Sequence, residues 1–159
     1  MKTKSTSIVW LTFLFALLLE IMPLPHWFDA LRPDWVLIVM SYWALALPHR
    51  YSVFTACGLG IILDLLLGAT IGSRGLAMSI IIYIVALNYQ RLRNFPIWQQ
   101  ALILTTTSFI YHTILFWIEY VISQVKFDPT FLLPIISNML IWPWAHWFLR
   151  RIRRHFKVK

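Results

Sequence analysis

The sequence predicts an all-α membrane protein, a bundle of six transmembrane helices in a single domain that spans residues 1–159. Hydrophobic residues make up 60% of the chain and charged residues only 13%, whereas a soluble domain of this size needs far more polar surface. A helix needs about 20 residues to cross the hydrocarbon core of a bilayer. The chain length therefore allows about six crossings joined by short loops, and it leaves no room for a separate soluble domain.

The boundaries of the predicted helices are set by prolines, glycines and polar residues. The first span ends near Pro23 and Pro25, and the second ends at Pro48, because proline cannot continue a helix without losing a backbone hydrogen bond. A glycine-containing turn at residues 68–73 separates the third and fourth spans, and a basic loop at residues 90–96 follows the fourth. The six predicted spans are residues 8–22, 35–47, 51–67, 75–89, 97–122 and 130–149.

The basic residues predict the orientation of the chain. With six spans both ends lie on one side of the membrane, and eleven of the fourteen Lys and Arg residues fall on that side. The exceptions are Arg32, Arg74 and Lys126. Because cytoplasmic loops carry the excess of Lys and Arg, we expect both termini in the cytoplasm.

The basic tail, residues 150–159, is expected to fix this orientation and to contact anionic membrane lipid. Docking of a cytoplasmic partner on the tail is the alternative. The net charge of +8 is concentrated next to the membrane, so we expect no nucleic-acid binding.

The acidic residues of the predicted spans fall in their outer halves, on the side opposite to the tail. A carboxylate within hydrocarbon is costly and needs a partner or a role. We therefore predict a polar cluster near the outer face, in which Glu20, Asp64 and Glu119 face the bundle interior and are partly balanced by Arg32 and Arg74. The alternative is that each acid lies near its helix end and reaches headgroup water.

The third span carries a regular pattern of small residues. Ala56, Gly60, Asp64 and Gly68 recur every fourth residue, so they lie along one face of a helix. Small residues let a second backbone come close, which is how helices associate in lipid. Two other spans place polar residues on one face in a similar way: Thr12, Ala16 and Glu20 on the first, and Ser108, His112 and Glu119 on the fifth.

The segment Arg32, Pro33 and Asp34 immediately precedes the second span. We expect Asp34 to supply a capping oxygen for that helix and to complement its dipole, with a contact to a partner protein as the alternative. In the fifth span, His112 is expected to be hydrogen-bonded inside the bundle rather than to act as a ligand. Asn138 of the sixth span could join the polar cluster.

The sequence contains no recognisable catalytic constellation. It has no HExxH motif and no glycine-rich loop of the kind that cradles phosphate. Asp64 also lacks a second acid in the sequence contexts that intramembrane aspartyl proteases use. We expect no enzymatic activity, no cofactor and no metal ion.

Four segments form a distinctive set: RPDWVLIVMSYWALALPHR (residues 32–50), GLGIILDLLLGATIGSRGLAMSIIIY (58–83), FPIWQQALI (95–103) and IWPWAHWFLRRIR (141–153). Together they resemble the MreD family of rod shape-determining membrane proteins. The resemblance implies a component of the bacterial inner membrane that binds MreC and works with MreB, RodA and the elongation transpeptidase in lateral peptidoglycan synthesis. It also implies a fold similar to the substrate-binding subunits of energy-coupling-factor transporters. Residues carried over as structural or interaction positions are Arg32, Pro33, Asp34, Gly60, Asp64 and Gly68.

Two functions are therefore considered. The first is a non-catalytic scaffold, whose small-residue grooves bind the transmembrane helix of a partner within the cell-elongation complex. The second is a transporter or small-ligand binder, in which acidic residues and His112 line a cavity open to the outside. The small size of the chain and the lack of paired interrupted helices favour the scaffold.

Overall fold

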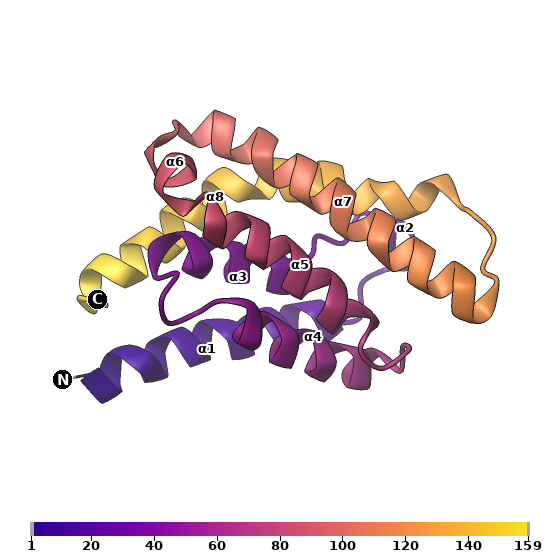
Figure 1. Cartoon of the computed structure of the whole chain (residues 1–159), viewed down its shortest axis with the longest axis horizontal. Coiled ribbons are helices and arrows are strands. Elements are labelled where there is room, and N and C mark those ends of the chain that lie inside the picture. Colours follow the sequence, from indigo (N-terminus) through magenta and orange to yellow (C-terminus); the bar gives the residue numbers. More distant parts are fainter. Residues whose placement is uncertain (1, 159) are drawn as a thin grey trace.

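The computed structural model describes residues 2–158 of the chain, including the side chains of residues 6–158. Over that range the chain is helical and contains no strand. Six long helices are joined by short connections (Figure 1). They are α1 (Lys2–Ile21), α3 (Trp35–Ala46), α4 (Val53–Leu67), α5 (Ser73–Leu87), α7 (Ile97–Ser123) and α8 (Leu133–His155), and between them lie α2 (His26–Asp29), α6 (Tyr89–Asn94) and the 3₁₀ helix η1 (Pro129–Leu132).

Each predicted span corresponds to one of the long helices, in the predicted order. Two helical segments, Ile97–Ser123 and Pro129–His155, are long and apolar enough to cross a membrane. The other four apolar helices are shorter, so it remains a prediction that all six cross the bilayer.

Two basic segments are more ordered than the sequence suggested. Residues 90–96 were expected to form a loop, but they include most of α6, in which the Leu92 amide donates to the Asn88 carbonyl at 3.0 Å. The predicted tail is also partly helical, because α8 continues to His155. Both segments are rich in arginine, which is a good helix former.

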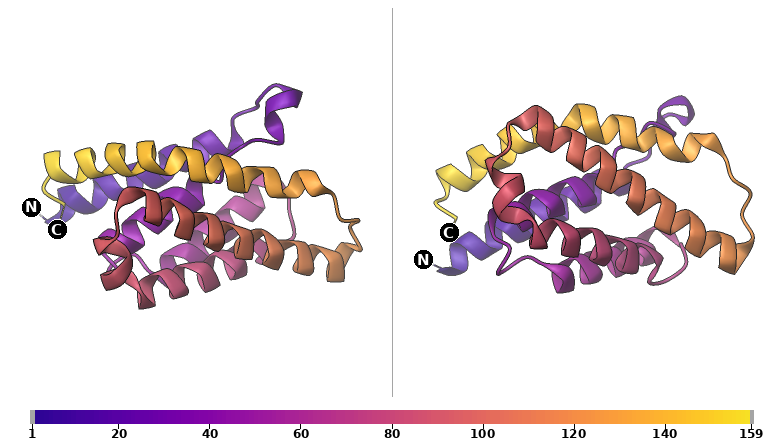
Figure 2. Two further views of the ribbon diagram at one scale, coloured as in Figure 1. Left: turned by 90° about the horizontal axis from the view of Figure 1, so that it is seen from above. Right: turned by 45° about the horizontal axis from the view of Figure 1, so that its top comes forward.

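Helix α3 forms the core of the bundle. Ten of its twelve residues are buried, because α1, α5 and α8 all pack against it (Figures 1 and 2). Trp43 is fully buried, and its indole Nε1 donates to Thr12 Oγ1 of α1 at 2.9 Å. A helix surrounded in this way is apolar on all its faces.

The small-residue face of α4 packs against α5 of the same chain. A Cβ atom added to Gly60 would lie 2.4 Å from Gly75 Cα, so the two backbones are in contact at this point. The groove that was predicted to receive a partner's helix at Gly60 is therefore filled internally. Gly68 lies outside this contact: it is exposed and ends α4 with φ 63°, donating its amide to the Asp64 carbonyl. Glycine adopts this left-handed conformation without the steric cost of a Cβ.

The outer surface of the bundle carries many large apolar side chains. Leu18, Phe54 and Leu65 are 59%, 91% and 60% exposed. An extensive apolar surface of this kind is typical of proteins that contact a membrane. The two termini lie at the same end of the bundle (Figure 2), as an even number of crossings requires.

Candidate functional site

Buried and half-buried polar side chains gather at the end of the bundle that lies opposite to the termini. Helices α1 and α4 end there, and α3, α5 and α8 begin there (Figure 1). We call this region the acidic end, defined by Glu20, Arg32, Asp34, Asp64, Arg74, Ser108, His112 and Asn138.

Asp64 is fully buried, and its carboxylate binds the beginning of the next helix. Oδ2 accepts hydrogen bonds from the backbone amides of Gly72, at 2.9 Å, and Arg74, at 3.1 Å. Oδ1 accepts from Ser73 Oγ at 3.3 Å and lies 4.0 Å from the Arg74 guanidinium. The first amides of a helix have no partner within it and carry partial positive charge. Asp64 of α4 thus acts as the cap of α5, which explains how an acid is accommodated inside the bundle.

Glu20 makes a similar contact between α1 and α3. Its side chain is buried, and Oε2 accepts from the amide of Val36 in the first turn of α3 at 3.4 Å. Arg32 approaches the end of α1 from the connecting loop: its guanidinium donates to the carbonyls of Glu20 and Met22 at 2.7 and 2.9 Å. Its ion-pair partner is Asp29, at 2.8 Å. Arg32 therefore caps the carboxyl end of α1. The prediction that it balances the buried carboxylates is wrong, because its ion-pair partner is Asp29.

Asp34 links the start of α3 to α7 and α8. Its Oδ2 lies 2.7 Å from His112 Nε2 and accepts from Asn138 Nδ2 at 2.8 Å. Asn138 Oδ1 in turn accepts the Asp34 amide at 2.8 Å, and Asn138 Nδ2 also contacts Ser108 Oγ at 3.1 Å. Asn138 and Ser108 are fully buried, and a buried network of this kind stabilises one arrangement of the helices when its groups are satisfied.

The capping role predicted for Asp34 is wrong. Asp34 occupies the position before α3, but its side chain makes no capping hydrogen bond there. His112 and Asn138 instead use its carboxylate, and they lie 78 and 104 residues further along the chain. The expectation that His112 is hydrogen-bonded inside the bundle is confirmed, and so is the participation of Asn138.

The structure brings together only part of the predicted polar cluster. Glu20 interacts electrostatically with both Asp34 and Arg74, so these groups share one region. Glu119 does not join them: it is half-buried on α7 and has no ion pair or side-chain hydrogen bond among the residues that the structure describes. Pro33 is buried, and its carbonyl accepts the Trp35 amide at 3.0 Å.

The acidic end has the properties of a structural network. The carboxylates of Asp64, Glu20 and Asp34 are bonded to donors on other helices or turns. Within residues 6–158, His, Cys, Asp and Glu side chains do not gather in threes in a way that would hold a metal ion. The hydrogen bonds tie α1 to α3, α4 to α5, and the start of α3 to α7 and α8, and they leave these carboxylates engaged within the chain.

Comparison with known proteins assigns the chain to a family. A sequence model of the family described as rod shape-determining protein MreD matches residues 1–152. The chain is also 36% identical over 146 residues to the rod shape-determining protein MreD of Haemophilus influenzae, with 92% of this chain and 90% of that protein covered. The chain belongs to the MreD family. This membership supports a role in rod shape determination and, together with the apolar helices, indicates a membrane protein. No solved structure matches the chain, so the similarity to energy-coupling-factor transporter subunits stays a prediction.

This MreD-family chain also has a surface feature that sequence reasoning missed. A groove of about 600 Å³ runs between α1 and α8, and α3 forms its floor. We call it the α1–α8 groove. Its principal lining residues are Leu11, Phe15 and Leu19 of α1, Trp35, Ile38 and Val39 of α3, and Ile141, Trp144 and Phe148 of α8. The groove depends on how three separate helices pack, and no local sequence pattern marks it.

Proposed function

We propose that this chain is a non-catalytic membrane scaffold of the bacterial cell-elongation complex, and that it binds the transmembrane helix of MreC in the α1–α8 groove. The family supports a role in rod shape, and the groove provides a surface that the fold itself leaves uncovered. The groove is the observation that carries the proposal.

The walls of the groove suit packing of a helix in lipid. Phe15 on one wall and Trp144 and Phe148 on the other are exposed, and the floor beside Ile38 is apolar. Helices in a bilayer associate chiefly through van der Waals packing, because lipid removes the hydrophobic driving force. A concave surface between two helices offers a third helix more contact area than a convex one.

The internal use of the acidic residues favours a scaffold over the alternative of a small-ligand transporter. Asp64, His112 and Glu20 bond to other parts of the same chain, so they are not free to bind a ligand from outside. The placement of both termini at one end, together with most of the basic residues, supports the proposal that this end is cytoplasmic in the inner membrane. MreB, RodA and the elongation transpeptidase are the further partners that we propose for lateral peptidoglycan synthesis.

The proposal is tested by photo-crosslinking in cells that express the full-length protein. A photoreactive residue replaces Phe15, Trp144 or Phe148 in the groove, or Phe54 on the outer face of α4 as a matched exposed aromatic control. We expect MreC adducts from the three groove positions and none from position 54. Adducts to lipid alone in the groove, or MreC adducts only at position 54, would contradict the assigned surface.

A further inference from the structure

The end of the bundle that holds the termini contains a pocket lined by positive charges. The pocket has a volume of about 660 Å³ and lies between α3, α6, the start of α7 and the end of α8. We call it the basic pocket, and its charged residues are Arg93, Arg150, Arg153, Arg154 and Lys157. No Asp or Glu lines it, and none of these five cations forms an ion pair among the residues that the structure describes.

The end of the chain is folded so that it closes one side of this pocket. After α8 ends at His155, Lys157 adopts a left-handed conformation with φ 48°. The amide of Val158 then donates to the Arg153 carbonyl at 3.0 Å, and the Val158 side chain is buried. A bonded turn with an apolar anchor holds Arg154 and Lys157 beside the pocket.

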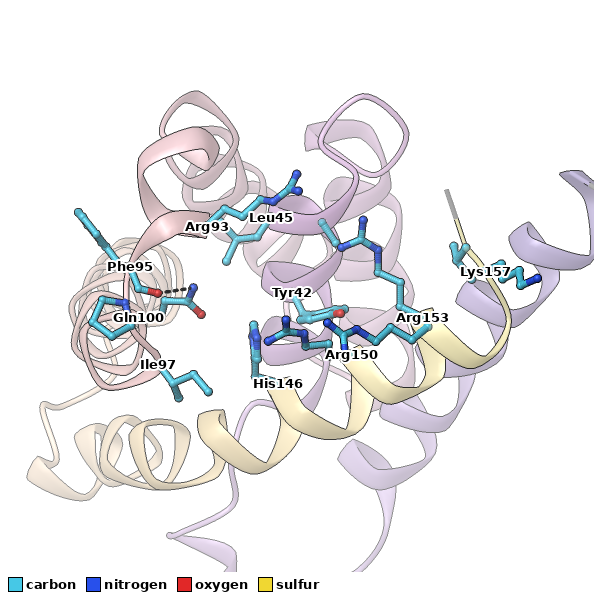
Figure 3. Close-up of a pocket in the computed structure, with 14 residues that line it drawn as sticks. Tyr42, Leu45, Arg93, Phe95, Ile97, Gln100, His146, Arg150, Arg153 and Lys157 are labelled. Atoms are coloured by element: carbon cyan, nitrogen blue, oxygen red, sulfur yellow. Dashed lines mark hydrogen bonds between the residues drawn. The ribbon is translucent and has the colours of Figure 1, made fainter.

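Polar groups with unused hydrogen-bonding capacity also face the pocket. Gln100 is buried, and its Nε2 donates to the carbonyls of Leu92 and Phe95 at 3.0 and 3.2 Å. These two bonds fix the carboxamide, yet its Oε1 is buried without a hydrogen-bond partner, as is Nδ1 of His146. Figure 3 shows Gln100 and His146 on either side of the space, with the hydroxyl of Tyr42 beside Arg153.

We propose that the basic pocket binds the phosphate of an anionic lipid headgroup, with phosphatidylglycerol as the representative ligand. Guanidinium groups bind phosphate oxygens through paired, charge-assisted hydrogen bonds. The buried Gln100 Oε1 can accept a hydrogen bond from a headgroup hydroxyl. A bound anion also relieves the repulsion among five cations that converge without a carboxylate.

The position and the remaining lining of the pocket favour a lipid over a soluble phosphate. The pocket lies where α3 ends and α7 begins, which is the level of the headgroups if these helices span the bilayer. Leu45, Phe95 and Ile97 add an apolar part to its lining, which suits the glycerol and upper acyl chain of a lipid but gives a free phosphate nothing to contact.

The test compares two charge-matched double variants of the full-length protein. Arg150→Gln with Arg153→Gln removes two cations from the pocket. Arg91→Gln with Arg151→Gln removes two cations nearby, on α6 and α8, that do not line it; Arg151 instead lies over the Trp147 ring at 5.3 Å. Delipidated protein in neutral detergent is titrated with phosphatidylglycerol or phosphatidylcholine and analysed by native mass spectrometry.

We expect the wild type and the control variant to bind one phosphatidylglycerol more tightly than phosphatidylcholine. The pocket variant should bind phosphatidylglycerol roughly thirtyfold more weakly, the factor expected for the loss of two basic groups near an anionic lipid. If the pocket variant does not fold, Arg154→Gln with Lys157→Gln is used, because both side chains are exposed and lie near the end of the chain.

Three results would overturn the proposal. Equal loss of binding in the pocket and control variants would mean that the lipid responds only to overall charge. A rise in melting temperature with glycerol 3-phosphate that matches the rise with phosphatidylglycerol would assign the pocket to a soluble phosphate. Displacement of bound lipid by an acidic peptide, with tighter binding of the peptide, would assign it to a protein segment.

Discussion

The two ends of this bundle handle charge in opposite ways. At the acidic end, the carboxylates of Asp64, Glu20 and Asp34 are buried or half-buried and bonded to groups elsewhere in the same chain. At the other end, the cations of the basic pocket converge without an acidic partner among residues 6–158. The first arrangement holds helices together, whereas the second leaves cations free to bind an anion from outside the chain. The difference teaches that the carboxylates of the acidic end serve the fold, whereas the cations of the basic pocket are available for binding.

The largest change in stability is expected when Asp64 is replaced. In Asp64→Leu, the amides of Gly72 and Arg74, the Ser73 hydroxyl and the Arg74 guanidinium lose their shared acceptor. Removal of one partner from a buried charged contact typically costs about 3–5 kcal/mol. We expect a loss of that size in the free energy of unfolding, measured by denaturant titration in detergent.

The control for this measurement is Asp29→Asn, which removes the exposed partner of the ion pair with half-buried Arg32. Exposed pairs contribute about 0–1 kcal/mol, so this variant should unfold almost like the wild type. An Asp64→Leu variant that is as stable as Asp29→Asn would show that the cap of α5 does not hold the bundle together.

The second prediction concerns the close approach of α4 and α5 at Gly60 and Gly75. In Gly60→Ala, the new Cβ would meet the backbone of Gly75 at 2.4 Å, so the helices must separate. Overpacking of this kind costs about 1–3 kcal/mol. The matched control is Gly58→Ala, where no atom lies within 4 Å of the added Cβ.

Replacement of glycine by alanine at an open helical position should stabilise the protein by about 0.5–1 kcal/mol. The two alanine variants on the same helix should therefore shift the melting temperature in opposite directions. A shift of the same sign and size in both would contradict the contact between Gly60 and Gly75.

A third prediction sharpens the comparison from the basic end. Arg150→Gln and Arg154→Gln remove exposed cations that have no ion pair within residues 6–158. Surface changes of this kind usually alter stability by no more than about 0.5 kcal/mol. We expect unfolding of the delipidated variants to match that of the wild type, and a loss comparable to that of Asp64→Leu would show that these cations serve the fold.

The smallest expected effect concerns Asp128, which lies in the exposed connection between α7 and α8, at the opposite end of the bundle from the basic pocket. The Thr130 amide donates to its carboxylate at 3.0 Å, and this hydrogen bond lowers the pKa of Asp128 below its ordinary value. Because the folded pKa is the lower one, the contribution to stability is present above the unfolded pKa and is lost as the pH falls through the folded pKa.

Hydrogen exchange of Phe131, whose amide donates to the Asp128 carbonyl at 3.0 Å, should therefore report faster opening of η1 in acid. In Asp128→Asn this additional pH dependence should be absent. Opening that responds to acid equally in both proteins would contradict the assignment to the Asp128 carboxylate.

Sequence reasoning succeeded where the deciding information is local. Apolar runs bounded by Pro23, Pro48 and the turn at residues 68–73 correctly predicted the order of the long helices. The fourfold spacing on the first and third spans also placed Ala16, Glu20 and Asp64 on buried faces. It failed for Glu119, because sharing a helical face with His112 does not ensure that the neighbouring helices extend far enough to cover both residues.

The sequence by itself determined the membrane class of the chain, its sequence of helices and the separation of acids from bases toward opposite ends. These properties follow from composition and from the periodicity of the backbone, which act over a few residues. Only the tertiary structure decided the partner of each charge. The Asp34 carboxylate bonds to residues of α7 and α8 rather than to the amides of its own helix. The five cations of the basic pocket converge from α6, α8 and the turn that follows α8. Contacts between distant segments depend on how whole helices pack, and packing is fixed by shape over the entire bundle.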